Sequence, residues 1–220
     1  MTLSSYNIGS VLTNSNGTRD DLIGGANITF SNGQVANGNA VYVGTGTFTS
    51  VGFSHGSHRQ GSVLDFTTAG TYLRNAATFW SGLATNGTIT WQYNQYTLTG
   101  SNANLNIFNI SGPNLAQATS VTINVPAGST ALVNVSGTNI SLHNFGMTVN
   151  GTNRQNLLFN FAPATSLNLS GIAVEGSVLA PSALVSVSNG QVNGNLIAAA
   201  FNGSGQVNNY LFIGCLPSVP

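Results

Sequence analysis

Charged side chains are scarce in this sequence. Only 4% of the 220 residues are Asp, Glu, Lys or Arg, against about 25% in an ordinary globular domain. Lysine is absent, and the four arginines are scattered along the chain. Because nucleic acids and anionic membrane surfaces are bound mainly by clustered Lys and Arg, the composition excludes nucleic acid as a partner. No apolar run approaches the ~20 residues of a membrane span, which excludes direct insertion into a membrane.

Cysteine is represented by a single residue, Cys215, so the chain has no internal disulfide. We expect this thiol to be buried as a small apolar side chain, and the alternative is a disulfide to another molecule. Without lysine, a Lys–Asn isopeptide bond between copies is excluded as well. A formal net charge of zero gives little repulsion between copies. We therefore expect self-association, non-covalent or through Cys215, or attachment to a surface or matrix polymer.

Most of the chain alternates apolar and polar residues in short runs bounded by Gly, Asn and Ser. Such alternation places Val, Ile and Leu on one face and Asn, Ser and Thr on the other, which is typical of half-buried β-strands. The clearest runs are 120–125, 130–135, 139–143, 166–170 and 183–187. The sequence therefore predicts an all-β fold.

An internal repeat suggests how these strands are arranged. Residues 31–35 read SNGQV, residues 188–192 repeat this sequence, and residues 203–207 are a degenerate copy. A second apolar run follows each copy, at 40–43, 196–198 and 210–212 respectively. Reuse of a strand–turn–strand unit is typical of a β-solenoid, in which each coil buries its apolar face on its neighbours. The spacing is irregular, and a β-sandwich would produce similar alternation. We expect a single domain over residues 1–220.

One segment, at about residues 65–84, has the spacing of an amphipathic helix. Apolar or small residues recur there every three or four positions. Asp65 is suited to cap the first turn, and Asn86–Gly87 to end the helix. We expect this single helix to pack against the flank or the end of the strands. The positions concerned are Phe66, Ala69, Leu73, Ala76, Ala77, Trp80, Leu83 and Ala84.

Two C-terminal runs, 174–181 (VEGSVLAP) and 188–198 (SNGQVNGNLIA), closely resemble the signature of the choice-of-anchor A domain. Residues 64–66, 105–110 and 127–137 are similar to other parts of that family's pattern. The resemblance covers about residues 6–214 and implies a secreted microbial surface domain without enzymatic activity. The ending also resembles the last coils of bacterial ice-binding domains, which implies a right-handed β-solenoid with a helix packed alongside.

Two motifs invite a catalytic interpretation. Residues 52–56 (GFSHG) fit the G-x-S-x-G pattern of a nucleophile elbow, but that elbow needs a strand followed by a helix in an alternating βα context. Glycoside hydrolysis needs two carboxylates flanking a cleft, and the chain has four acidic residues in total. Glu175, set among apolar residues, would need a partner if its side chain pointed inward. We expect no enzyme, no catalytic residue and no cofactor.

Metal binding has weak candidates only. His55 and His58 form an H-x-x-H motif in a Gly/Ser loop, without a third ligand nearby. Asp20 and Asp21 offer adjacent carboxylates for a structural cation, but a hard cation such as Ca²⁺ needs six to eight oxygens. We expect no metal site, with Asp20 and Asp21 as the weak candidates.

Two kinds of function remain. The first is a structural or adhesive module at the microbial cell surface, possessing strand edges that could assemble into filaments or a surface layer. The second is ice or polysaccharide binding by a flat polar face, for which Thr-rich runs at 45–49 and 88–90 are candidates if they stack in register. Either function implies an extracellular location. Aromatic residues outside the helix could form adhesive contacts, although we expect most of them to be in the core: Trp91, Tyr93, Tyr96, Phe145, Phe159, Phe161, Tyr210 and Phe212.

Overall fold

The computed structural model describes residues 1–220, of which about half lie in β-strands. The contacts divide the chain into two compact units, Met1–Ala69 and Gly70–Pro220. The prediction of one domain over 1–220 stays a prediction. None of the helices is both long and apolar enough to cross a membrane.

The first unit contains seven strands in two parallel sheets. One sheet has β4 at its centre, with β1 and β2 on one side and β6 on the other, and the second has the order β3-β5-β7. The repeat at 31–35 lies in β4, where Asn32 has a left-handed φ of 54° and the following Gln34 N–H donates to the Tyr6 carbonyl at 3.0 Å. The strands are β1 (Thr2–Ser4), β2 (Asn7–Ile8), β3 (Asp20–Gly24), β4 (Ile28–Val35), β5 (Asn39–Tyr42), β6 (Gly46–Phe53) and β7 (His58–Gln60).

The second unit contains the remaining strands. It begins within α1 (Phe66–Ser81), and a second, four-residue helix is α2 (Gly112–Leu115). A short 3₁₀ turn, η1, spans Arg154–Asn156. The strands are β8 (Thr88–Gln92), β9 (Gln95–Thr99), β10 (Leu105–Ser111), β11 (Ser120–Asn124), β12 (Thr130–Ser136), β13 (Asn139–His143), β14 (Gly146–Asn150), β15 (Leu157–Asn160), β16 (Ser166–Ser170), β17 (Ala173–Val174), β18 (Ser177–Ser188), β19 (Gln191–Asn193), β20 (Leu196–Gly203) and β21 (Gln206–Asn208).

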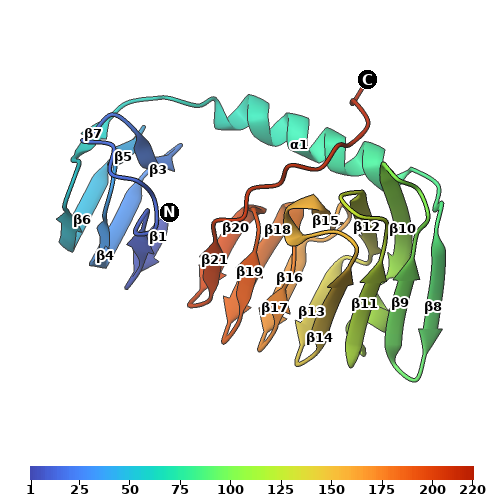
Figure 1. Ribbon diagram of the computed structural model, residues 1–220. Coiled ribbons are helices and arrows are strands. Elements are labelled where there is room, and N and C mark those ends of the chain that lie inside the picture. Colours follow the sequence, from blue (N-terminus) through green and yellow to red (C-terminus); the bar gives the residue numbers. More distant parts are fainter. The chain divides into compact units, whose positions relative to one another are not determined.

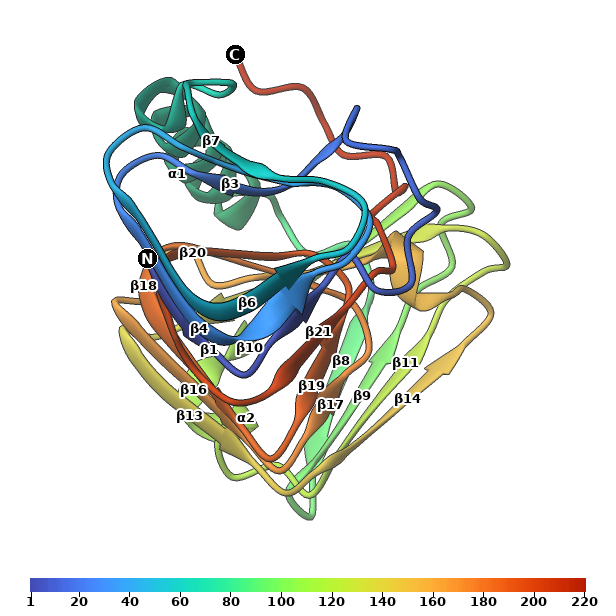
Figure 2. The same ribbon diagram turned by 90° about the vertical axis from the view of Figure 1, so that its left-hand side faces the viewer.

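Parallel pairing between successive circuits of the chain builds this unit. A curled sheet joins β10-β12-β15-β18-β16-β13, with β20 paired to β18, while β14-β11-β9-β8 and β17-β19-β21 form two further sheets. In Figure 2 the chain follows a three-sided path, and its successive circuits lie one behind another. Only β8 and β9 pair antiparallel. The pairing therefore disagrees with the alternative of a β-sandwich, whose sheets are antiparallel.

The two C-terminal copies of the repeat stack directly on each other. Gln191 pairs with Gln206 and Val192 with Val207, in register. Asn189 is left-handed, with a φ of 49°, like Asn32 in the first unit. A side chain at Gly190 would place its Cβ 2.4 Å from the Ile172 carbonyl oxygen, so this corner requires glycine.

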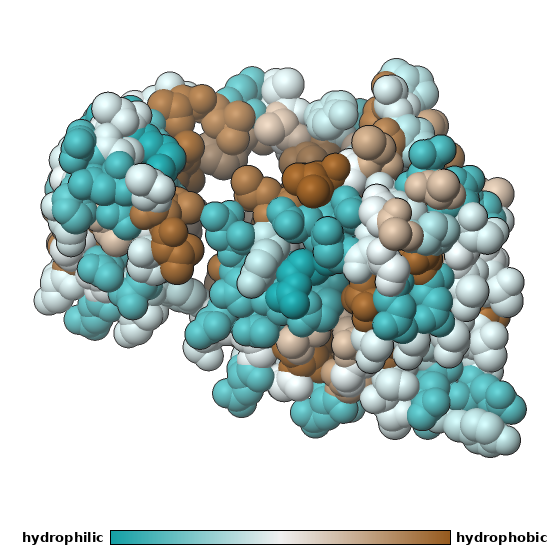
Figure 3. Space-filling model, viewed as in Figure 1, coloured by the Kyte–Doolittle hydropathy of each residue, from teal (hydrophilic) through white to brown (hydrophobic).

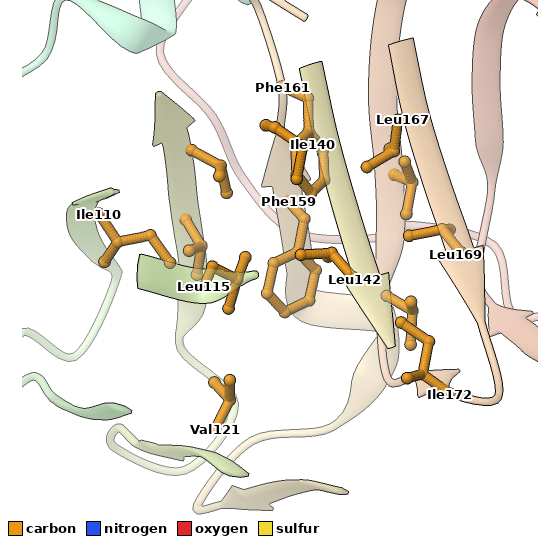
Figure 4. Close-up of a cluster of buried hydrophobic side chains, with 14 of the residues drawn as sticks. Ile110, Leu115, Val121, Ile140, Leu142, Phe159, Phe161, Leu167, Leu169 and Ile172 are labelled. Carbon is orange, nitrogen blue, oxygen red and sulfur yellow. The ribbon is translucent and has the colours of Figure 1, made fainter. Parts of the chain in front are cut away.

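Apolar side chains fill the interior of the second unit. Phe108, Val133, Phe159 and Val178 occupy matched positions on β10, β12, β15 and β18, and all are buried. Figure 4 shows the neighbouring part of this core, with Leu115, Leu142 and Phe159 pointing toward one another from α2, β13 and β15. Runs 120–125, 130–135, 139–143 and 166–170 form strands as predicted, and run 183–187 lies within β18.

Helix α1 packs on the outer face of the curled sheet. Ala77 is buried against Ile107, Leu132, Leu158 and Leu179. Figure 1 shows the helix running above β10, β12, β15 and β18, the strands that carry these residues. Asp65 caps the helix as predicted, because its Oδ1 accepts from the Thr67 and Thr68 N–H groups at 2.9 and 3.0 Å. The helix ends at Ser81, before the Asn86–Gly87 stop that we predicted.

The last twelve residues form no strand, which corrects the prediction of an apolar strand run at 210–212. Their backbone bonds to scattered partners on several circuits. Phe212 N–H donates to Asn195 Oδ1 at 2.8 Å, Ile213 N–H to the Gln155 carbonyl at 2.9 Å, and Cys215 N–H to Thr130 Oγ1 at 2.9 Å. The Cys215 side chain is exposed. The favoured prediction of a buried thiol was therefore wrong.

Candidate functional site

A flat polar surface lies on the outside of the sheet β14-β11-β9-β8. Along each strand, apolar residues point to the core and polar residues point to the opposite side; on β11, Val121 and Ile123 are buried while Ser120, Thr122 and Asn124 are partly exposed. We call this outer surface the threonine face. Its twelve positions are Thr88, Thr90, Gln92, Gln95, Thr97, Thr99, Ser120, Thr122, Asn124, Gly146, Thr148 and Asn150.

The strand register arranges these residues in three ranks across the sheet. The middle rank consists of four threonines, Thr90, Thr97, Thr122 and Thr148, paired strand by strand. Neighbouring members of a rank are about 4.8 Å apart, and neighbouring ranks are about 6.7 Å apart, because strand spacing and residue rise are fixed by the backbone. The Thr-rich run at 88–90 therefore does stack in register. The other two ranks are Gln92–Gln95–Ser120–Gly146 and Thr88–Thr99–Asn124–Asn150.

Ring packing on the inner side of the sheet and a hydrogen bond within the threonine face both restrict the motion of its side chains. The Trp91 and Tyr96 rings pack 4.5 Å apart on the inner side of β8 and β9. Tyr96 is buried, and this burial raises the pKa of its hydroxyl, which stays a neutral donor to the Ser111 carbonyl at 3.4 Å. At the edge, Asn150 Nδ2 donates to Asn124 Oδ1 at 2.8 Å. White and teal prevail over β8 and β9 in Figure 3, as expected for hydroxyl and amide side chains.

None of the twelve positions of the threonine face is occupied by a charged residue. Arg74 and Arg154 are the nearest charged residues in the sequence, and none of the 79 residues between them is Asp, Glu, Lys or Arg. The twelve positions themselves therefore offer only hydroxyl, amide and methyl groups, and the charges next to β14 are paired with each other: the Glu175 N–H donates to Met147 Sδ at 3.4 Å, and the Glu175 carboxylate binds Arg154. The Thr-rich run at 45–49, in the first unit, contributes to a smaller array of the same kind: Thr47 pairs with Thr29, which pairs with Thr2.

Comparison with known proteins assigns a family to this architecture. Residues 1–209 match the family model described as "Putative Ice-binding-like adhesive domain". The chain belongs to this ice-binding-like adhesive family. A solved structure that it resembles is the ice-binding protein of an Antarctic ascomycete, Antarctomyces psychrotrophicus, with 18% identity, a TM-score of 0.35, and coverage of 90% of this chain and 94% of that chain. A search of the curated proteins found no match.

Family membership agrees with the resemblance to ice-binding domains that the C-terminal runs indicated. The finer resemblance to choice-of-anchor A domains is not shown by these comparisons.

Asp20 and Asp21, the weak cation candidates of this adhesive domain, are both paired with arginine. Arg59 binds Asp20 through two hydrogen bonds of 2.8 and 2.9 Å, and Arg19 Nε lies 2.5 Å from Asp21 Oδ1. The side chain of Asp21 is 1% exposed, and that of Asp20 is 17% exposed. No group of three or more His, Cys, Asp or Glu side chains gathers anywhere in the chain. These carboxylates are thus neutralised by guanidinium groups.

The GFSHG motif ends strand β6, and β7 follows it, so the strand–helix context of a nucleophile elbow is missing. The two histidines are separated in role. His55 Nδ1 is 3.2 Å from the Ala36 carbonyl oxygen, whereas His58 stacks on Phe48 with ring centroids 4.6 Å apart. Neither arrangement presents both imidazoles to one metal ion.

Glu175 has two partners. Arg154 Nη2 lies 2.9 Å from its Oε2, and Asn193 Nδ2 donates to its Oε1 at 2.8 Å. The Arg154 guanidinium in turn lies 4.6 Å from the centre of the Tyr210 ring. Of the aromatic candidates, Tyr96, Phe145, Phe159 and Phe161 are buried in the core, as we expected of most of them. Trp91 and Phe212 are partly buried against core clusters, whereas Tyr93 and Tyr210 are exposed, at 84% and 41%.

An open hollow of about 510 Å³ lies beside the last turn of α1 and the strands β10 and β12. Its polar lining includes Asn109 and Asn134, but their amides are already hydrogen-bonded to each other and to carbonyls of the helical segment. The amide groups in the hollow are therefore already occupied. The threonine face has more polar groups available to a ligand, and it suits an extended one.

Proposed function

We propose that this protein is a non-enzymatic adhesive module that acts outside the cell and binds an extended, repeating surface through its threonine face. The observation that carries the proposal is the middle rank of four threonines on four adjacent strands. A single hydroxyl contact contributes only about 1 kcal/mol, so such a face holds its target only when many contacts form at once.

Membership of an ice-binding-like adhesive family supports this function. The side-chain partners described above support it too. His55 and His58 have separate partners, and the carboxylates of Asp20, Asp21 and Glu175 are held in ion pairs rather than gathered in a shared cleft. An uncharged surface suits an extracellular setting, since its contacts vary little with salt and pH.

Adhesion can be tested with beads that carry the full chain in a flow cell. We expect retention on ice or on microbial cell walls, with strong loss when Thr122→Lys places a long charged side chain in the centre of the middle rank. Ser186→Lys, on the sheet half formed by β13, β16 and β18, is the matched control and should retain binding. Equal loss with both variants, or no retention on either surface, would refute the proposal.

Ice is the first specific target to test. The rank spacings set by the strands form a two-dimensional lattice of methyl and hydroxyl groups, which is the kind of pattern that an ordered water layer can match. A thermal-hysteresis measurement decides this version: a freezing-point gap that disappears with Thr122→Lys supports it. The absence of a gap at high protein concentration would remove ice, but not adhesion to other surfaces.

We also propose that the strands wind as a right-handed β-solenoid with α1 alongside. Support comes from the parallel register between successive circuits and from the strong right-handed preference of parallel crossover connections. An experimental structure showing left-handed winding would overturn this proposal.

Self-association is a second candidate function, favoured by the last circuit of the second unit. β21 pairs only with β19 and is the last strand of the sheet β17-β19-β21. Val207 on β21 pairs with the buried Val192 but is itself 48% exposed, and no charged residue lies nearby in sequence to oppose pairing. We propose that a second copy covers this end.

Sedimentation velocity and negative-stain electron microscopy test self-association directly. Concentration-dependent dimers or filaments that are lost with Val207→Lys are expected, because a charge at the open end would have to be buried. Monomers at all concentrations would reject it, while leaving the adhesive function intact.

A further inference from the structure

We propose that the ligand of the threonine face is a neutral polysaccharide, and that Tyr93 stacks on one of its sugar rings at the edge of the face. This inference rests on the proposed adhesive function and names its ligand. Tyr93 follows Gln92, which is the first member of the rank Gln92–Gln95–Ser120–Gly146, and it lies at the tip of the β8–β9 hairpin.

Charge selects the class of polymer. None of the twelve positions is charged, and Arg154 and Glu175 beside β14 are paired with each other, so the threonine face offers no unpaired cation for uronates, sulfates or phosphates and no unpaired anion for amines. A charged polymer would lose part of its hydration at this surface without gaining an opposite charge. A neutral polymer with many hydroxyl groups loses nothing of this kind.

The hydrogen-bonding groups of the face fit hydroxyl groups in both roles. A sugar hydroxyl donates one hydrogen bond and accepts others, so its partner must be able to do both. The threonine hydroxyls meet this requirement individually, and the amides of Gln92, Gln95 and Asn150 meet it with separate donor and acceptor atoms. The ranks repeat these groups about every 4.8 Å, a spacing comparable to that of successive rings in an extended glycan.

Tyr93 supplies the apolar contact that a polar array lacks. Its side chain is 84% exposed, the most exposed of the large hydrophobic residues in the chain. A tyrosine ring presents an apolar face and a hydroxyl, and it loses little conformational entropy on binding because it has two side-chain torsions. Sugar rings offer matching C–H faces. A ring that projects from a hairpin tip does not fit against a planar ice lattice, so the position of Tyr93 favours a glycan as the ligand.

The test is retention of the full chain by insoluble neutral glycans. Soluble protein is mixed separately with β-1,3-glucan, α-mannan and chitin, and with alginate as a polyanionic probe, and the fraction left in solution is measured over a range of polymer amounts. We expect at least one neutral glycan to bind and alginate not to bind. Tyr93→Ala should weaken binding about tenfold, the loss expected when one aromatic contact of an interface is removed.

Matched variants separate a local contact from a loss of folding. Tyr72→Ala removes another exposed tyrosine, 56% exposed on α1, and should leave binding unchanged. Thr122→Lys should abolish it. Far-ultraviolet circular dichroism of each variant checks that the strands remain.

The outcomes distinguish this inference from the adhesive function. If no neutral glycan is retained while the beads still hold to ice, the polysaccharide inference is overturned and the adhesive function stands. If glycan binds equally well with Tyr93→Ala, the stacking role is overturned. If alginate binds as well as the neutral glycans, the charge argument is wrong. Loss of both ice and glycan retention refutes both proposals.

Discussion

A ladder of three asparagines is predicted to hold helix α1 on the curled sheet. Asn109, Asn134 and Asn160 pair in register on β10, β12 and β15. Asn134 Nδ2 donates to Asn109 Oδ1 at 2.8 Å and to the Trp80 carbonyl at 2.9 Å, while its Oδ1 accepts from Asn160 Nδ2 at 2.9 Å. The perturbation is Asn134→Ala, which removes all three hydrogen bonds at once.

The expected cost follows from these bonds and from burial. Asn134 is 4% exposed, so water cannot readily replace the amide. Each hydrogen bond contributes about 1 kcal/mol, and leaving the Trp80 carbonyl unpaired adds a desolvation cost, which together give about 3–4 kcal/mol of lost unfolding free energy. Asn160 retains its donation to the Ala77 carbonyl at 2.8 Å, which limits the damage.

Urea unfolding monitored by tryptophan fluorescence measures this cost. Both tryptophans, Trp80 on α1 and Trp91 on β8, belong to the unit Gly70–Pro220, so the signal reports on that unit. A Trp91→Phe background leaves Trp80, whose environment changes when the helix leaves the sheet. The control is Asn168→Ala, a partly exposed asparagine with one bond of 3.3 Å, for which we expect less than about 0.5 kcal/mol.

Equal destabilisation by Asn134→Ala and Asn168→Ala would refute the reasoning. A double-mutant cycle with Asn160→Ala provides a second check. Since Asn134 and Asn160 share a hydrogen bond, the two costs should not add, and the coupling should exceed about 0.5 kcal/mol. Simple additivity would mean that the ladder does not act as a unit.

Four further predictions follow from single contacts. Asp65 has a pKa below its usual value because its carboxylate accepts from the Thr68 hydroxyl and N–H. The contribution of this carboxylate to stability is present above the unfolded pKa and is lost as pH falls through the folded pKa. Asp65→Asn should therefore make acid denaturation, monitored by circular dichroism, less dependent on pH. Glu175→Gln should cost less than about 1 kcal/mol in the same urea titration, because the side chain of its partner Arg154 is 37% exposed. Cys215 should react fully with a thiol reagent in the folded protein, and a requirement for denaturant would contradict its exposure. Gly151→Ala should cost more than about 2 kcal/mol, since a Cβ there would lie 1.7 Å from the Val125 carbonyl oxygen.

Local structure was largely predictable from the sequence. Alternation identified strands such as β11 and β13, and the three-to-four spacing with Asp65 identified α1. These features depend on residues close in sequence, where side-chain direction is set by the period of the element. The C-terminal segment could not be predicted in this way, because its backbone bonds to distant groups such as Asn195 Oδ1 and Thr130 Oγ1.

The register between paired strands could not be predicted from the sequence. Leu105 pairs with Thr130 and Ala131 with Leu157, which are offsets of 25 and 26 residues, whereas Val178 pairs with Leu196 at an offset of 18. Corners of different lengths thus break the period that a repeat search requires. A signal does exist: the buried ladder and the exposed rank both use offsets of 25 and 26 residues. The buried ladder consists of Asn109, Asn134 and Asn160, and the exposed rank contains Thr97, Thr122 and Thr148.

These two ladders differ in what covers them. Under α1 the stacked asparagines are enclosed by helix carbonyls and Leu side chains, and the amide nitrogens of Asn134 and Asn160 donate within the fold and stabilise it, while Asn160 Oδ1 accepts no hydrogen bond. On β8, β9, β11 and β14 no helix covers the stacked threonines, and their hydroxyls remain available to a ligand. The same backbone repeat therefore gives a structural seam on one side and a binding array on the other. It follows that changing a threonine of the middle rank should alter adhesion far more than stability, and changing an asparagine of the ladder should do the reverse.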